Sequence, residues 1–225
     1  QGVKEIVLTG VDISDYGSDF DTGYSMSNLI LDILKKTDLK RLRLSSIDCA
    51  EIDDHFDEVI VNPRVMPHLH LSLQSGDNMI LKRMKRRHNT DDIRKFVNRC
   101  RNLRREITFG ADIIAGFPTE TEEMFNNTYK LLQNCNISHL HIFPFSPKKG
   151  TPAGRMPQLE KSIIKKRAME LRMLGEDLIS KIKKDLKSPR KVLIEEINNG
   201  EVIGYDQNYI KHHIPMIGLP IGEIV

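Results

Sequence analysis

The stretch HLHLSLQSGDNMILKRMKRR, residues 68–87, joins a strand pattern to a polar turn and then to a strongly basic helix. Leu69, Leu71 and Leu73 recur with a period of two, so their side chains share one face of a β-strand. Gln74 and Ser75 are thereby delivered to the end of the strand, where the helix start at Asp77 could meet an anionic ligand. The pattern predicts a cofactor site, although a strand, a turn and a solvated helix face would also explain this stretch.

Strand and helix patterns alternate along the chain up to residue 145. One helix begins, by its pattern, with an N-cap at Thr90, and the next begins with a capping box formed by Thr119 and Glu122. Because βα units with right-handed crossovers form parallel sheets, the chain is predicted to be an α/β protein with a parallel sheet or barrel wall. The expected strands cover residues 4–10, 41–47, 68–73, 107–116 and 139–145.

Each expected strand ends in a turn that contains polar residues or glycine. Ligands of parallel α/β sheets bind at the carboxyl ends of the strands, so these turns are expected to surround one site. Loop geometry alone would explain each turn singly, but not why polar residues recur in them. The turns are Gly10-Val11-Asp12, Ser45-Ser46, Gln74-Ser75-Gly76, Gly116-Phe117-Pro118 and Phe145-Ser146-Pro147.

The composition is ordinary for a soluble protein, with 39% hydrophobic and 29% charged residues in a chain of 225 residues. The net charge of +3 is small, but lysines and arginines cluster along the chain. Such clusters suit a phosphate backbone, and the solvated faces of surface helices are the alternative. No stretch approaches the roughly 20 apolar residues that cross a bilayer, and no secretory signal is visible. We therefore expect a cytoplasmic protein that does not contact a membrane.

The three cysteines, Cys49, Cys100 and Cys135, lie far apart in the sequence. Their number and spacing indicate neither a disulfide framework nor a local zinc or iron–sulfur motif. Cys100 and Cys135 fall at apolar positions of expected helices, so we predict that both are buried.

The last part of the chain has a different pattern. Residues 159–186 have the apolar spacing of one long amphipathic helix with a basic outer face. After Ser188-Pro189 the period changes to two, with a turn at Asn199-Gly200, which predicts a small β module.

Four strings carry a resemblance to a known family: LTGVDISDYG, LHLSLQSGDNMILKRMKRRH, DIIAGFPTETEEMF and FPFSPKKGTPA. They resemble the radical S-adenosylmethionine (SAM) methylthiotransferases that modify tRNA beside the anticodon. LSSIDCAEID and HIFPFSPKKGTPA resemble the branch that acts on N6-threonylcarbamoyladenosine at A37. The resemblance implies a partial radical SAM (β/α)6-type barrel over residues 1–157, a connecting amphipathic helix over 158–187, and an incomplete TRAM-like β module over 188–225.

The resemblance also implies SAM as cofactor and gives roles to residues at the strand ends. Gly10, Val11 and Asp12 match the motif that receives the methionine amino group. Arg86 matches an arginine that pairs with the methionine carboxylate, and Arg87 is the alternative. Asp112 would accept from the ribose hydroxyls.

Further cofactor contacts follow from the same resemblance. Ser46 and Gln74 fall where relatives contact the ribose and the carboxylate, Gly116 would let the backbone approach the adenine, and residues 145–147 would flank the base. The complete set of expected cofactor-binding residues is Gly10, Val11, Asp12, Ser46, Gln74, Ser75, Arg86, Asp112, Gly116, Phe145 and Ser146.

The β module would contact tRNA by stacking and by binding phosphates. The residues expected to do so are Tyr205, Asn208, Tyr209, Lys211 and His212. A β-barrel surface with aromatic core residues is the alternative.

One departure from the family concerns the mechanism. The CxxxCxxC loop that ligates three irons of a [4Fe-4S] cluster is missing from this sequence. The chain begins with Gln and is expected to start just after the first barrel strand and its cysteine loop. We therefore expect binding of SAM and tRNA without turnover, and we separately expect the chain to be a monomer. Radical replacement of an adenine C–H by a methylthio group would need the cluster-bearing segment, in a longer chain or a companion polypeptide.

Two other classes of function are compatible with the residues. His68-x-His70 and His139-x-His141 each place two imidazoles on one strand face, a pattern that binds zinc in hydrolases built on α/β barrels. A non-catalytic tRNA-binding remnant would bind tRNA in a salt-dependent manner without binding the cofactor.

Overall fold

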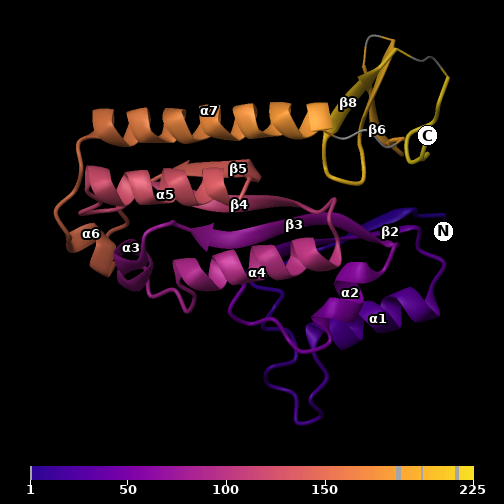
Figure 1. Cartoon of the computed structure of the whole chain (residues 1–225), viewed down its shortest axis with the longest axis horizontal. Coiled ribbons are helices and arrows are strands. Elements are labelled where there is room, and N and C mark those ends of the chain that lie inside the picture. The colour runs from indigo at the N-terminus through magenta and orange to yellow at the C-terminus, as the bar shows by residue number, and fades with distance from the viewer. Residues whose placement is uncertain (1, 186–188, 199, 216–217) are drawn as a thin grey trace.

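A parallel sheet forms the body of the chain in the computed structural model, which describes residues 2–185, 189–198, 200–215 and 218–225. Within these residues the sheet has five strands in sequential order, all parallel, as predicted (Figure 1). The strands are β1 (Glu5–Leu8), β2 (Arg41–Ile47), β3 (Val65–Gln74), β4 (Thr108–Ala115) and β5 (Ile137–Pro144).

Helices follow each strand and cover the apolar face of the sheet. Leu69, Leu71 and Leu73 of β3 lie in the hydrophobic core, as their period of two predicts. The opposite face of the same strand carries His68, His70 and Ser72, so the inner surface of the partial barrel is polar. The helices of this part are α1 (Met26–Lys36), α2 (Phe56–Val61), α3 (Asn78–Arg83), α4 (Thr90–Leu103), α5 (Glu122–Asn134) and α6 (Pro152–Arg155).

Two helix starts differ from the predictions. Asn89, and not Thr90, is the N-cap of α4, because its side chain accepts from the Asp91 and Asp92 amides. The predicted capping box of Thr119 with Glu122 is wrong: Thr121 caps α5, and Thr119 lies in the preceding turn with a φ of 67°.

The start of α3 does not offer free amides to an anion. The Asp77 carboxylate accepts from the backbone N–H groups of Met79 and Ile80, at 2.9 and 3.1 Å. A second negative group at this position would meet a like charge, so the prediction of an anionic ligand at this helix start is wrong.

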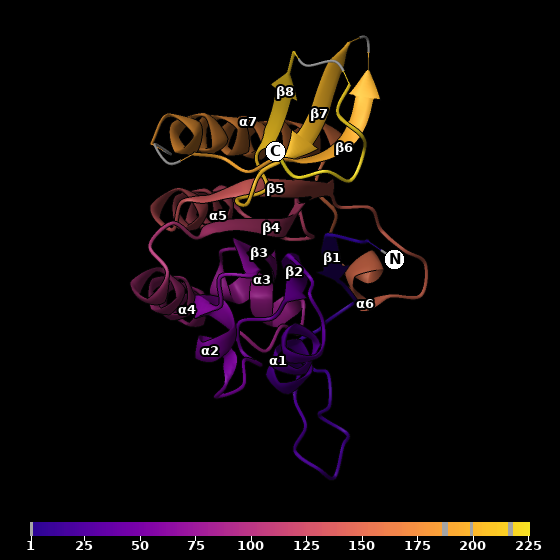
Figure 2. The ribbon, with the colours of Figure 1, turned by 90° about the vertical axis from the view of Figure 1, so that its right-hand side faces the viewer.

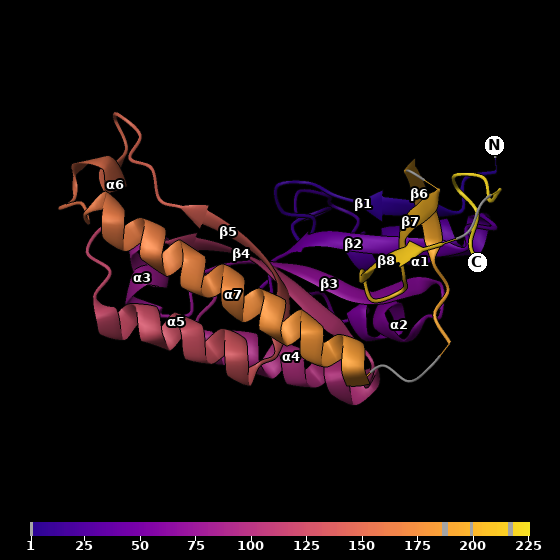
Figure 3. The same cartoon turned by 90° about the horizontal axis from the view of Figure 1, so that it is seen from above.

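The long helix α7 (Lys161–Asp185) packs on the body of the sheet. It runs beside α5 and contacts β5, with Ala168, Leu171, Leu174 and Leu178 in the hydrophobic core (Figure 3). Gly175 lets it approach, since a Cβ there would lie 3.1 Å from the Ser138 carbonyl oxygen. No helix among the described residues is both long enough and apolar enough to span a bilayer.

The C-terminal residues form a small antiparallel sheet in the order β6-β7-β8, as the change of period predicts. Its strands are β6 (Leu193–Asn198), β7 (Glu201–Tyr205) and β8 (Lys211–Ile214). Ser188 and Asn199, which the sequence places at the start of this module and in its first turn, lie outside the described residues. Figure 2 shows this sheet standing over the end of the large sheet where its strands begin.

Candidate functional site

Three of the predicted site residues lie at strand ends with left-handed backbone. Ser46 has a φ of 61°, Gln74 of 67° and Gly116 of 75°. For a non-glycine residue this conformation costs about 1–3 kcal/mol, and it persists where the surrounding structure holds it, often at functional sites. The carboxyl ends of β2 and β3 are therefore candidates for ligand contact, in agreement with the sequence pattern.

A polar corner joins the ends of β2 and β3. The Arg86 Nη2 donates to Asp48 Oδ2 at 3.2 Å and to the Ser72 carbonyl at 2.7 Å. His88 Nδ1 lies 3.1 Å from Asp48 Oδ1, and its Nε2 lies 3.1 Å from the Leu73 carbonyl. Burial acts to raise the pKa of Asp48, but the hydrogen bond from His88 and the charge of Arg86 outweigh it and lower that pKa. Asp48 is thus a carboxylate at neutral pH.

The turn after β1 borders the same corner. Oxygens of Asp12, Asp48 and Glu51 lie within 4.8 Å of one another, and the Ile13 amide donates to the Ser46 carbonyl at 3.4 Å. Gly10 and Asp12 also line a cavity of about 570 Å³ beneath the loop that precedes α1. Val11 is 98% exposed and does not line this cavity. The structure therefore brings Asp12, Ser46 and Arg86 together.

Asp112 lies deeper on the inner face of the sheet. Its Oδ1 is 3.0 Å from His70 Nε2 and 3.3 Å from His141 Nδ1. Burial raises its pKa, but the hydrogen bond from His70 and the charges of both imidazoles lower it below the usual range. The remaining exposed carboxylate surface, 26% of the side chain, can accept further hydrogen bonds.

The paired histidines predicted from sequence are divided between two environments. His70 and His141 form a group with Asp112 whose ligand atoms lie within 4.8 Å of one another, a spacing that a metal ion could bridge. His68 instead hydrogen-bonds Thr108 at 2.9 Å, and His139 donates to the Tyr209 carbonyl at 3.1 Å. Each of the predicted His-x-His pairs is therefore split, because neighbouring strands, and not neighbouring positions, supply the contacts.

The other predicted cofactor residues face elsewhere. Ser75 is buried and meets Thr128 of α5, with 3.3 Å between the hydroxyl oxygens. Gly116 lies against α7, since a Cβ there would be 2.6 Å from Ile164 Cγ1. Phe145 and Ser146 line a separate cleft of about 520 Å³ between the end of β5 and α7.

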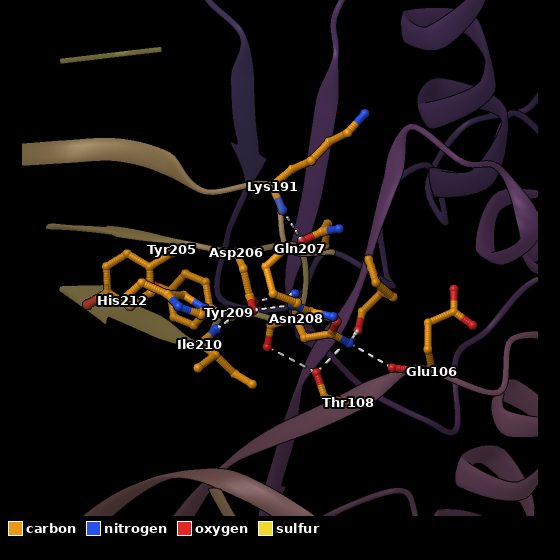
Figure 4. A network of polar contacts seen from close by, with 12 residues as sticks. Glu106, Thr108, Lys191, Tyr205, Asp206, Gln207, Asn208, Tyr209, Ile210 and His212 are labelled. Carbon is orange, nitrogen blue, oxygen red and sulfur yellow. Dashed lines mark hydrogen bonds and ion pairs between the residues drawn. The ribbon is translucent and has the colours of Figure 1, made fainter. Parts of the chain in front are cut away.

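The small sheet closes the opposite end of the large one through its β7–β8 turn (Figure 4). Asn208 is buried, and its amide donates to the carbonyls of Pro67 and Glu106 at 3.0 and 2.7 Å. The Thr108 hydroxyl donates to the Asn208 carbonyl at 3.1 Å, and Arg43 donates to the Asp206 carbonyl at 2.7 Å. The side chain of Asn208 is thus occupied by contacts within the chain.

Tyr209 is the aromatic centre of this junction. Its ring stacks on His68 and on Tyr205, with centroid distances of 5.3 and 4.7 Å, and the Arg43 guanidinium lies 5.1 Å from its centroid. The ring nevertheless keeps some solvent exposure. The sequence did not indicate this packing, because His68 and Tyr209 are distant in the chain.

Two further predicted RNA contacts line a basic groove at the end of α7. Lys211 and His212 of β8 border a cavity of about 330 Å³ together with Lys183 and His213. The Asp206 Oδ2 lies 2.9 Å from His212 Nε2 and 2.7 Å from Arg190 Nε. Burial acts to raise the pKa of Asp206, but these two hydrogen bonds outweigh it and lower that pKa. Lys211 is exposed and lines this cavity, so its ammonium group is accessible to a phosphate.

Similarity to known proteins agrees with this architecture. The sequence profile of the Radical SAM superfamily matches residues 1–132. The chain belongs to the radical SAM superfamily. Over its full length it is 48% identical to the threonylcarbamoyladenosine tRNA methylthiotransferase MtaB of Rickettsia prowazekii, of which it covers 53%. It is 38% identical over 99% of its length to the protein of the same name from Thermotoga maritima, of which it covers 51%.

The radical SAM chain therefore spans about half the length of these curated relatives. Among solved structures, Streptococcus suis SuiB bound to S-adenosylmethionine is 12% identical, with a TM-score of 0.48 over 81% of this chain and 37% of that one. SAM and a [4Fe-4S] cluster are the cofactors of the superfamily. The polar corner that contains Asp12 and Arg86 offers the charged groups that can bind the amino and carboxylate groups of an amino-acid moiety.

The cysteines of this chain do not fit an iron–sulfur cluster. Cys100 lies in α4 and Cys135 directly follows α5; both are buried, as predicted, and burial raises the pKa of both, that of Cys100 to about 12. Burial also raises the pKa of Cys49 to about 12. Cluster ligands are thiolates that converge on one point, whereas burial disfavours the thiolate form here and no possible metal-binding group among the described residues contains more than one of these cysteines.

Proposed function

We propose that this chain is the cofactor-binding part of a tRNA methylthiotransferase that acts on N6-threonylcarbamoyladenosine. The observation that carries the proposal is the corner at the ends of β1, β2 and β3, where Asp12, Arg86 and the left-handed Ser46 meet in a radical SAM chain. Its 48% identity to a relative of that name supports the choice of substrate. A tRNA-modifying protein of this kind would work in the cytoplasm.

The chain alone is proposed to bind SAM as a monomer without turning it over. The carboxylate of the cofactor would pair with Arg86 and its amino group with Asp12, since opposite charges within contact distance favour each ionised form. Asp112 would accept from the ribose. Turnover would require thiolate ligands that Cys49, Cys100 and Cys135 do not supply.

Calorimetric titration with S-adenosylhomocysteine tests the cofactor site. We expect binding by the wild type and at least a tenfold loss in the double variant Arg86→Ala, Asp112→Ala, because each change removes a charged contact. Lys95→Ala, at an exposed position of α4, is the matched control and should bind like the wild type. No heat for the wild type, or equal heat in the double variant, would contradict the proposal.

The tRNA-binding surface is proposed to lie on the small sheet β6-β7-β8, which follows α7 in the chain. Tyr205, Lys211 and His212 are its residues, with Tyr209 available at its exposed edge; Asn208 is left out because its amide is used inside the chain. Filter binding at increasing salt should show an affinity that falls with ionic strength, and Lys211→Ala should reduce the slope by about one phosphate contact. Salt-dependent tRNA binding without S-adenosylhomocysteine binding would favour the non-catalytic remnant instead.

A further inference from the structure

Arg86 contacts the buried Asp48, and Asp48 is held in turn by the buried His88. We infer that Asp48 and His88 are positioning residues that aim the Arg86 guanidinium at the carboxylate of the cofactor's amino-acid moiety. This inference rests on the proposed function, and it explains why a flexible side chain at the end of a short helix can recognise a carboxylate.

The contacts of Arg86 fix the Nη2 atom of its guanidinium and do not use the Nη1 atom. Both contacts of Arg86, to Asp48 and to the Ser72 carbonyl, use Nη2. Its Nε is buried without a hydrogen-bond partner among the described residues, and Nη1 takes part in neither contact. A guanidinium has five N–H donors in a fixed plane, so anchoring one nitrogen orients the others. A carboxylate at this corner would accept from Nη1, which neither contact uses.

Exposure separates the positioning residues from the group that meets the ligand. The side chains of His88 and Asp48 are 1% and 5% exposed, whereas that of Arg86 is 27% exposed. Of these three, only Arg86 can therefore reach a ligand at the rim. Its backbone is placed by the turn that ends α3, where Lys85 has a φ of 57° and the Arg86 amide donates to the Leu81 carbonyl.

The hydrogen bonds of His88 fix the position of Asp48. Its two ring nitrogens face a carboxylate oxygen of Asp48 and the Leu73 carbonyl, and both of these groups only accept. Each nitrogen faces an acceptor, so the ring links Asp48 to the backbone of β3. Asp48 is thus held through Oδ1 by His88 and contacts Arg86 through Oδ2.

The acidic neighbours complete the match to a zwitterion. Asp12 lies beside Asp48, and Glu51 pairs with Arg87 on the outer side. An amino-acid moiety would place its ammonium group near Asp12 and its carboxylate near Arg86. A ligand without the carboxylate would keep the first contact and lose the second.

The test compares two ligands by calorimetry: S-adenosylhomocysteine and its decarboxylated analogue. In the wild type, the ratio of the two affinities measures what the carboxylate contributes. We expect Asp48→Asn and His88→Gln each to reduce this ratio about tenfold while the affinity for the decarboxylated analogue stays within about twofold, since only the charge-assisted contact is disturbed. His55→Gln, at an exposed position of the same chain, is the matched control.

A double-mutant cycle separates positioning from a merely structural role. In the Arg86→Ala background, Asp48→Asn should change neither affinity further, because its target is already missing. Equal loss of both ligands in the single variants, or an additive loss in the double variant, would overturn the inference while leaving the cofactor site intact. Binding of neither ligand by the wild type would refute the proposed function itself, and the inference with it.

Discussion

Replacement of Gly116 by alanine tests why glycine occupies the end of β4. The residue has a φ of 75°, and an added Cβ would lie 2.6 Å from Ile164 Cγ1 and 3.1 Å from two further atoms of that side chain. Left-handed backbone costs alanine about 1–2 kcal/mol, and forcing a methyl group into a packed interface costs about 1–3 kcal/mol more. Gly116→Ala should therefore lower the free energy of unfolding by about 2–5 kcal/mol.

Gly150 provides the matched control for the conformational part of this cost. Its φ is 87°, but no atom lies within 4 Å of its potential Cβ. Urea denaturation followed by far-ultraviolet circular dichroism should place Gly116→Ala below Gly150→Ala by about 1–3 kcal/mol, the overpacking component. In an Ile164→Ala background the additional cost of Gly116→Ala should be smaller than in the wild type, because the contacted side chain is already removed. Equal destabilisation by the two glycine variants would refute the packing explanation and favour a role in ligand approach alone.

Two further predictions concern the junction between the sheets. Asn208→Ala should lower the free energy of unfolding by about 2–4 kcal/mol, because it leaves the Pro67 and Glu106 carbonyls without their donor. The control variant Asn198→Ala, at an exposed position, should change the free energy of unfolding by less than about 0.5 kcal/mol. Similar effects of the two variants in urea denaturation would show that the junction does not stabilise the fold. Burial lowers the pKa of His139 to about 4, so between pH 6.5 and 4 the unfolded state binds more protons and stability should fall as the pH drops. His139→Gln should flatten this dependence in denaturation curves recorded across that range, and an unchanged slope would mean that another group is responsible.

Local periodicity predicted the elements of this fold well. The alternation of Leu69, Leu71 and Leu73 reports one buried face, and such a pattern depends only on neighbours in sequence. The first residues of the helices were predicted less accurately. Several neighbouring residues can act as N-cap, and only the backbone path decides among them: Asn89 or Thr90 for α4, and Thr119 or Thr121 for α5.

The contacts that build the site could not be read from the sequence. Asp48 and His88 are 40 positions apart and meet only because β2 and β3 pair in parallel. The predicted strand ends lie within two residues of the observed ones, but side-chain direction was not evident from them: Ser75 turns toward α5, while Asp112 turns to the inner face.

Asn208 illustrates the same limit at the other end of the sheet. A polar residue beside Tyr209 in a turn is typical of an RNA-binding surface, yet its amide is buried against two carbonyls. Hydrogen-bonding capacity is a property of the residue, but the choice between solvent, RNA and backbone partners depends on tertiary contacts.

The seating of the β7–β8 turn on His68, Thr108 and Arg43 has a practical consequence for protein engineering. A chimera that exchanges residues 189–225 for the equivalent segment of a distant homologue would keep His68, Thr108 and Arg43 but could lose their contact partners in the β7–β8 turn. The donor segment would need to keep an asparagine and an aromatic residue at positions 208 and 209, or the acceptor would need matching changes at its strand beginnings. Modular exchange therefore has to be planned across both segments together.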